Sequence, residues 1–139
     1  MKVVVDTSVW SLALRQNSST ESSQTDDGVK VALLRDWITD GRVVLLGAIR
    51  QEILSGIRHP EQYVRLRDYL RAFPNVELAT ADYEMAAEFY NTCRQKGIQG
   101  SNTDFLICAA ACQRNYGILT TDHDFQNFRE HIPITLMEH

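Results

Sequence analysis

With 139 residues, 44% of them hydrophobic and 23% charged, the chain falls in the range of one compact globular domain over residues 1–139. The N-terminus lacks the long apolar stretch of a signal peptide or a membrane span, so we expect a cytoplasmic protein with no membrane contact. Three cysteines without a CxxC pair do not fit a disulfide framework or a zinc site, and the net charge of −4 argues, taken alone, against a nucleic-acid binder.

The first third of the chain predicts two strands separated by helices. Val3–Val5 is a β-branched run suited to a strand buried on both faces, and a helix is expected to start after Asp6. The polar segment 17–28, rich in Ser and Thr, predicts a loop. Apolar residues at helical spacing over 33–38 predict a helix that ends at Gly41, and a second strand follows over 42–46.

The rest of the chain continues to alternate between the two kinds of element. Residues 47–57 predict a helix with Glu52 on its flank, and a further helix runs from Pro60 to Pro74. A third strand is expected over 76–79 and a helix over 82–96. The segment 100–115 is apolar almost all round, which predicts a buried helix. Strands over 118–121 and 134–137, with a short helix over 125–130, complete the pattern.

This alternation predicts the fold class. Strands that are each followed by a helix form a parallel sheet with right-handed crossovers, covered by helices on both faces. We therefore expect an α/β protein with three layers, α/β/α, around a central parallel sheet of about five strands.

Four carboxylates stand at the ends of predicted elements. Asp6 and Asp122 end the first and fourth strands, Glu52 lies in the helix after the second strand, and Asp104 opens the buried helix. In open parallel sheets the ligand site forms beyond the carboxyl ends of the strands. The four side chains are therefore predicted to face one crevice.

Each acid also has a purely structural interpretation. Ser101 and Asp104 fit a helix-capping pair, in which the positive helix end favours the carboxylate. Asp6 fits a helix cap after a strand, and Glu52 fits a surface glutamate whose apolar neighbours weaken that interpretation.

A group of carboxylates in one cleft is costly, because each negative charge disfavours the next, and a bound cation reverses that cost. Oxygen ligands without cysteine or a histidine pair suit Mg²⁺ or Mn²⁺ better than zinc. Such a site fits hydrolysis of a phosphodiester, with one acid as a possible general base for water.

Four stretches in this order resemble the PIN-domain nucleases, in particular the VapC-type toxins of bacterial and archaeal toxin–antitoxin pairs. They are VVVDTSVW (3–10), GAIRQEILSG (47–56), GSNTDFLICAAA (100–111) and ILTTDHDF (118–125). The resemblance implies a single PIN domain over 1–139 with the activity of a Mg²⁺- or Mn²⁺-dependent endoribonuclease. It also implies an RNA substrate, a cognate antitoxin protein that silences the enzyme, and a homodimer.

The resemblance assigns roles to individual residues. Asp6, Glu52 and Asp104 fall on the family's first three acidic positions, and Thr7 or Ser8 and Asn102 fall on its polar supports. Either Asp122 or Asp124 completes the set as a metal ligand. We favour Asp122 because it follows the strand more directly and Thr120 matches the hydroxyl that often precedes the family's acid. His123 is expected to be an exposed neighbour, because hard cations prefer oxygen.

Other residues that attract attention have ordinary interpretations. We expect Trp10, Trp37, Cys108 and Cys112 to pack in the core or an interface. Between positions 50 and 71, five arginines against three acids give a local net charge of +2. Arg15, Arg50 and Arg58 are candidates for contacts to phosphate or antitoxin, and a solvated helix face is the alternative for each.

Three rival functions remain open. One is a PIN-domain nuclease of RNA processing without a toxin role, and another is a PIN-like binding module with a degraded metal site. The third is a Mg²⁺-dependent phosphoacceptor signalling domain, although no lysine follows Lys96 near the last strands. A phosphatase of the haloacid-dehalogenase type would need an aspartate where Ser8 stands.

Overall fold

The computed structural model describes residues 1–15 and 25–137. Within this part, a parallel sheet of three strands has the order β2-β1-β3, formed by β1 (Val3–Val5), β2 (Val43–Val44) and β3 (Gly117–Leu119). In the register, Val4 lies opposite Val44 on one side and Ile118 on the other. The prediction of an α/β fold with a parallel sheet is confirmed.

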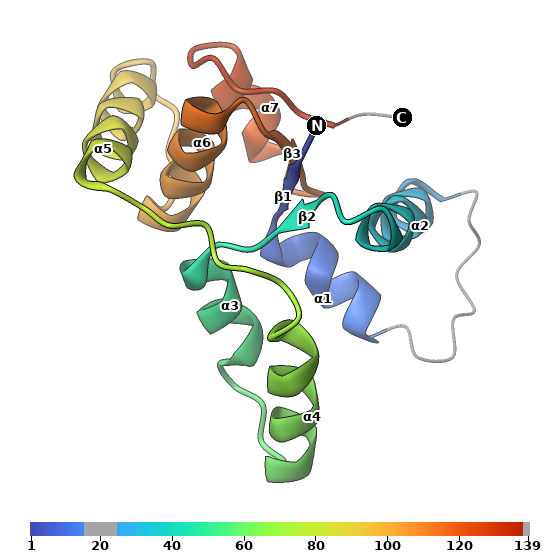
Figure 1. Ribbon diagram of the computed structural model, residues 1–139. Helices are drawn as coiled ribbons and strands as arrows, with labels where there is room; N and C mark the ends of the chain where they lie inside the picture. The colour runs from blue at the N-terminus through green and yellow to red at the C-terminus, as the bar shows by residue number, and fades with distance from the viewer. Residues whose placement is uncertain (16–24, 138–139) are drawn as a thin grey trace.

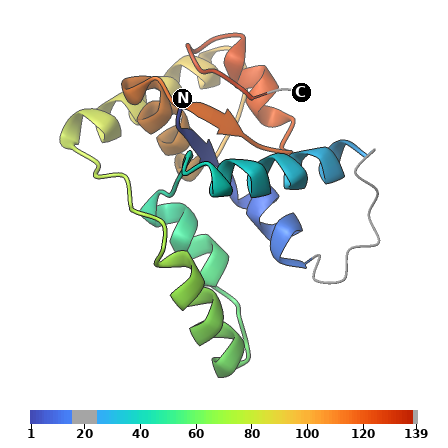
Figure 2. The same cartoon turned by 45° about the vertical axis from the view of Figure 1, so that its right-hand side comes forward.

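Helices cover both faces of the sheet (Figure 1). One side carries α1 and α2, and the other carries α5, α6 and α7, while α3 and α4 form an arm that projects from the body in both views (Figures 1 and 2). Their bounds are α1 (Thr7–Arg15), α2 (Asp26–Thr39), α3 (Gly47–Leu54), α4 (Pro60–Leu70), α5 (Thr80–Gln95), α6 (Asn102–Arg114) and α7 (Asp124–Arg129). No described helix is long and apolar enough to cross a membrane.

The expectation of about five strands is wrong in number but right in position. The predicted third and fifth strands each contribute a single parallel bridge, Leu45 to Asn75 and Ile118 to Leu136. Each bridge is held by two backbone hydrogen bonds, such as that from Val76 N to Leu45 O at 2.9 Å. Pro74 has no N–H with which to extend the first of these bridges toward its N-terminal side.

The predicted loop over 17–28 extends too far at its C-terminal end, because α2 already begins at Asp26. Residues 26–28 form the first turn of α2, because the Thr25 hydroxyl accepts a hydrogen bond from Gly28 N at 2.9 Å and caps the helix. Positions 17–24 of the predicted loop lie outside the described residues.

The core extends from the sheet to α6 and also to α1, α2 and α3. Val3–Val5 are fully buried, as are Ile107 and Cys108 on the helix that was predicted to be buried. Trp10 packs edge-on against Phe73, with ring centroids 5.4 Å apart. Trp10, Trp37 and Cys108 therefore pack as expected, and Cys112 is partly buried against the same core.

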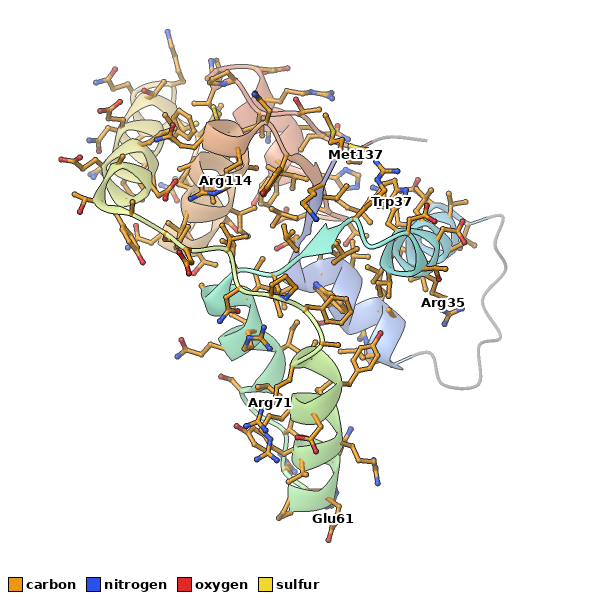
Figure 3. All side chains as sticks on the ribbon, viewed as in Figure 1. Arg35, Trp37, Glu61, Arg71, Arg114 and Met137 are labelled. Carbon is orange, nitrogen blue, oxygen red and sulfur yellow. The ribbon has the colours of Figure 1, made fainter. Side chains whose placement is uncertain are left out.

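Two arginines fix the helices that surround the sheet. Arg50 donates to the carbonyl oxygens of Leu70 and Phe73 at 2.9 and 2.8 Å, so it ties α3 to the end of α4. These bonds, with one from Nε to Asn75 Oδ1 at 3.0 Å, give Arg50 a structural role that the sequence did not predict. On α6, Arg114 (Figure 3) pairs with the buried Asp82 of α5 at 2.7 Å.

Candidate active site

Asp6 stands where β1 ends and is 7% exposed. Its Oδ2 accepts two hydrogen bonds of 2.8 Å, one from the Ser8 hydroxyl and one from the Thr120 hydroxyl. Thr120 directly follows β3, so the two hydroxyls hold the Asp6 carboxylate from neighbouring strand ends. Neither bond uses Oδ1, which has no hydrogen bond among the described residues.

The same network positions Asp122. The Thr120 hydroxyl oxygen accepts from Asp122 N at 2.9 Å, and the Ser8 hydroxyl oxygen accepts from Thr121 N at 3.1 Å. Both loops beyond the strands are thereby held together, and Asp122 lies two residues from the group that binds Asp6. Hydroxyl groups suit this role because each can donate once and still accept.

Asp124 has a different environment. It is the first residue of α7, and its backbone N–H donates to Asp122 Oδ1 at 2.9 Å. Its side chain is exposed, as is His123. Asp122 Oδ1 therefore accepts the N–H of the first residue of α7, and Oδ2 has no hydrogen bond within the described part of the chain.

Asp104 lies in the first turn of α6 and is partly buried. It forms the predicted capping box: Ser101 N donates to its Oδ2 at 3.1 Å, and the Ser101 hydroxyl accepts from its N–H. Burial raises the pKa of the Asp104 carboxyl, the hydrogen bonds with Ser101 lower it, and the charges of Asp6 and Asp122 raise it further. Three carboxylates from distant parts of the sequence therefore share one electrostatic field.

Glu52 occupies the rim of this site. Its side chain is exposed, and Oε1 accepts a hydrogen bond from the Thr7 hydroxyl at 2.9 Å. Because Thr7 follows Asp6 in the chain, the contact brings α3 to the end of β1. Of the predicted polar supports, Ser8 contacts Asp6 and Thr7 contacts Glu52, whereas Asn102 lines a pocket between α5 and α6.

Lys30 was not predicted to contribute. Its ammonium donates to the carbonyl oxygen of Thr120 at 2.8 Å and lies 3.6 Å from Asp26. The contact spans 90 positions and uses a backbone acceptor, so neither composition nor spacing signals it. A partly buried cation thus supports the strand end that carries the Asp6 partner.

The donor set fits a hard cation by its chemistry. All candidate ligands are carboxylate oxygens, which Mg²⁺ and Mn²⁺ prefer. Among the described residues, however, no three acidic, histidine or cysteine side chains lie close enough to form a metal-binding cluster. The binding of a metal by Asp6, Glu52, Asp104 and Asp122 remains a prediction.

Comparison with known proteins identifies the fold. The family profile of the PIN domain matches residues 3–130. A search of curated protein sequences found no significant match.

Several solved structures share this architecture. A chain of VapBC2 from Rickettsia felis, bound to a DNA fragment from the promoter, aligns with a TM-score of 0.73 and 17% identity, over 99% of this chain and 98% of that one. VapBC-1 from nontypeable Haemophilus influenzae gives 0.74 and 14%, with the same coverage. VapBC-5 from Mycobacterium tuberculosis, a member of a family of toxin–antitoxin systems, gives 0.68 and 18%, and covers 100% of both chains. At these identities the likeness establishes a common fold.

Proposed function

The chain belongs to the PIN-domain family, a family of nucleases, and from this premise we propose that it is a Mg²⁺- or Mn²⁺-dependent endoribonuclease that acts as the toxin of a VapBC-type pair. The observation that supports the proposal best is the shared field of three acids. Burial raises the pKa of the Asp104 carboxyl most, and the charges of Asp6 and Asp122 raise it further, although the three residues come from three separate segments of the chain. Carboxylates that repel one another across a site favour a divalent cation, which cancels the repulsion.

In this proposal Asp6, Asp104 and Asp122 hold the ion and Glu52 completes the set from the rim, with Asp124 as the alternative to Asp122. When bound, such an ion stabilises the charge that develops on the phosphodiester oxygens.

The chain's own residues prepare the site. Ser8 and Thr120 fix the Asp6 carboxylate through Oδ2, and these bonds leave Oδ1 for the ion. Thr7 fixes Glu52 in the same manner, and Lys30 holds the strand end beneath. Preorganised side chains lower the cost of arranging the reacting groups.

The partners follow from the same proposal. The structural neighbours include VapBC proteins of a toxin–antitoxin family, one of them bound to promoter DNA, which supports an antitoxin partner for this chain. We further propose an RNA substrate and a homodimer. Expression of the chain alone should then arrest bacterial growth, and the product of the adjacent reading frame should relieve the arrest. Growth without arrest, from a chain that cleaves RNA in vitro, would favour the nuclease of RNA processing.

The direct test is cleavage of a mixed RNA pool by the purified chain in Mg²⁺ or Mn²⁺. EDTA and Asp6→Asn should each abolish cleavage, while Asp40→Asn, an exposed acid at the end of α2, should leave it unchanged. Cleavage that persists in EDTA would contradict the metal-dependent mechanism. Uptake of acyl phosphate without RNA cleavage would instead support a signalling domain.

A further inference from the structure

A pocket lies between α5 and α6, and one of its lining residues, Thr103, precedes Asp104 in the chain. These two helices lie side by side in the ribbon (Figure 1), and the pocket between them has a volume of about 380 Å³. That volume falls within the range of small-molecule sites. The acids discussed above do not line it, and none of the residues that do is charged.

The lining combines aromatic rings with amide and hydroxyl groups. Tyr83 and Tyr90 come from α5, Asn102 and Thr103 come from α6, and Asn91 adds a second amide. Tyr90 packs edge-on against Phe105, with ring centroids 5.6 Å apart, which fixes its ring. Tyr83 is 55% exposed, so its ring is accessible to a ligand at the edge of the pocket. Aromatic faces stack on nucleobases, and amides bind their edges in pairs of hydrogen bonds.

The pocket and the acidic site share the N-terminal end of α6. Asn102 and Thr103 are the first two residues of α6, and Asp104 follows them. Helical geometry turns each residue by about 100°, so Asp104 points away from the α5 side that carries the pocket. The two sites thus flank one helix end, separated by about 10 Å, the width of a helix. A single-stranded polynucleotide reaches across such a distance within one or two residues.

We propose that this pocket binds an unstacked base of the RNA, one or two nucleotides from the phosphodiester that is cleaved, an inference that rests on the proposed nuclease function. A cluster of carboxylates in a chain of net charge −4 offers little attraction for a phosphate backbone. Binding through an uncharged aromatic pocket supplies affinity without phosphate contacts. The absence of any basic lining residue argues against a phosphate as the occupant.

The test measures binding of single-stranded RNA hexamers of adenosine, uridine or cytidine by the full chain, with Asp6→Asn added to prevent cleavage. Tyr83→Ala removes the exposed ring, and Ala87→Trp fills the pocket without removing a contact. We expect each change to weaken binding of the preferred hexamer by about 5- to 150-fold, as for a lost base stack. The matched controls are Tyr69→Ala on α4, which removes a ring that is 47% exposed, and Ala81→Trp on another face of α5.

Two further measurements separate base binding from charge. Tyr83→Ala should leave the slope of log K against log salt unchanged, because no phosphate contact is lost. A hexamer with one abasic position should lose affinity by a similar factor and should no longer respond to Tyr83→Ala.

Equal affinity of Tyr83→Ala, Ala87→Trp and their parent for every hexamer would overturn the proposal. So would a dimer that Ala87→Trp converts to a monomer without a change in RNA affinity, because the pocket would then be covered by a second copy. If the wild-type chain cleaves RNA and the pocket variants bind RNA as tightly as their parent, base binding by the pocket is rejected and the nuclease function stands. If binding depends on the pocket but the wild-type chain cleaves no RNA, the nuclease function is rejected and base binding by the pocket stands.

Discussion

Thr120→Val tests the network around Asp6 most sharply. Valine has nearly the same shape as threonine, so the change removes the hydroxyl and leaves the packing of a residue that is 7% exposed. Two short hydrogen bonds disappear, the donation to Asp6 Oδ2 at 2.8 Å and the acceptance from Asp122 N at 2.9 Å, together with the longer contact of 3.3 Å to the Ser8 hydroxyl.

The magnitude follows from these two bonds. A hydrogen bond to a charged group contributes about 1.5–3 kcal/mol, and an N–H that loses its acceptor costs about 1 kcal/mol when water can partly replace it. We therefore expect Thr120→Val to lower the free energy of unfolding by about 2–4 kcal/mol. For a chain of this length, that loss corresponds to a decrease in Tm of roughly 6–15 °C.

Urea unfolding and RNA cleavage assays on the same preparations separate stability from activity. Thr120→Ser keeps the hydroxyl and should retain most of the stability and cleavage. Thr121→Val is the matched control, because only the backbone N–H of Thr121 takes part in the network. An unfolding free energy for Thr120→Val equal to that of Thr121→Val would refute the hydroxyl's role in holding Asp6.

In the metal-free chain, Asp104 should contribute stability below pH 3.8 that is lost as pH rises through its raised pKa, because the folded state binds that proton more tightly than the unfolded state. Asp104→Asn, which can still cap α6, should remove this contribution from pH-dependent unfolding. The Arg114 guanidinium lowers the pKa of Asp82, so this pair stabilises the fold above pH 3.8 and the contribution disappears as pH falls through the lowered pKa. Arg114→Met should lower the free energy of unfolding by about 2 kcal/mol at neutral pH and should weaken its decrease at acid pH. Unchanged unfolding curves would contradict the buried pair. Arg50→Met should lower Tm by releasing the carbonyls at the end of α4, whereas the exposed Arg58→Met should not.

Much of the fold could be predicted because the chain carries strong local signals. The β-branched run Val3–Val5 and the all-round apolar α6 each have one physical solution, burial in the centre of the sheet layers. The lengths of the edge strands could not be predicted, because the sequence of an apolar extended segment does not show how many of its residues pair with the neighbouring strand. The start of α2 could not be predicted, because Thr25 stands in a polar run in which several other Ser, Thr and Asp residues could equally cap a helix.

The candidate site shows the same division. Asp6, Asp104 and Asp122 could be proposed from their positions at element ends, and the capping box of Ser101 could be anticipated from spacing. The contacts of Lys30 and Arg50 could not, because both bind backbone carbonyls whose positions depend on the tertiary fold.

Titration of the metal-free chain with Mn²⁺, followed by calorimetry, tests the central claim that the separate acids share a cation. We expect the wild type to bind Mn²⁺ and Asp6→Asn, Asp104→Asn and Asp122→Asn each to weaken binding at least about tenfold, whereas Asp40→Asn should bind like the wild type. Asp124→Asn decides between Asp122 and Asp124 as the fourth acid, because only the residue that binds the ion should weaken Mn²⁺ binding when it is replaced. A wild type that binds no Mn²⁺, or three variants that bind it equally well, would contradict the claim.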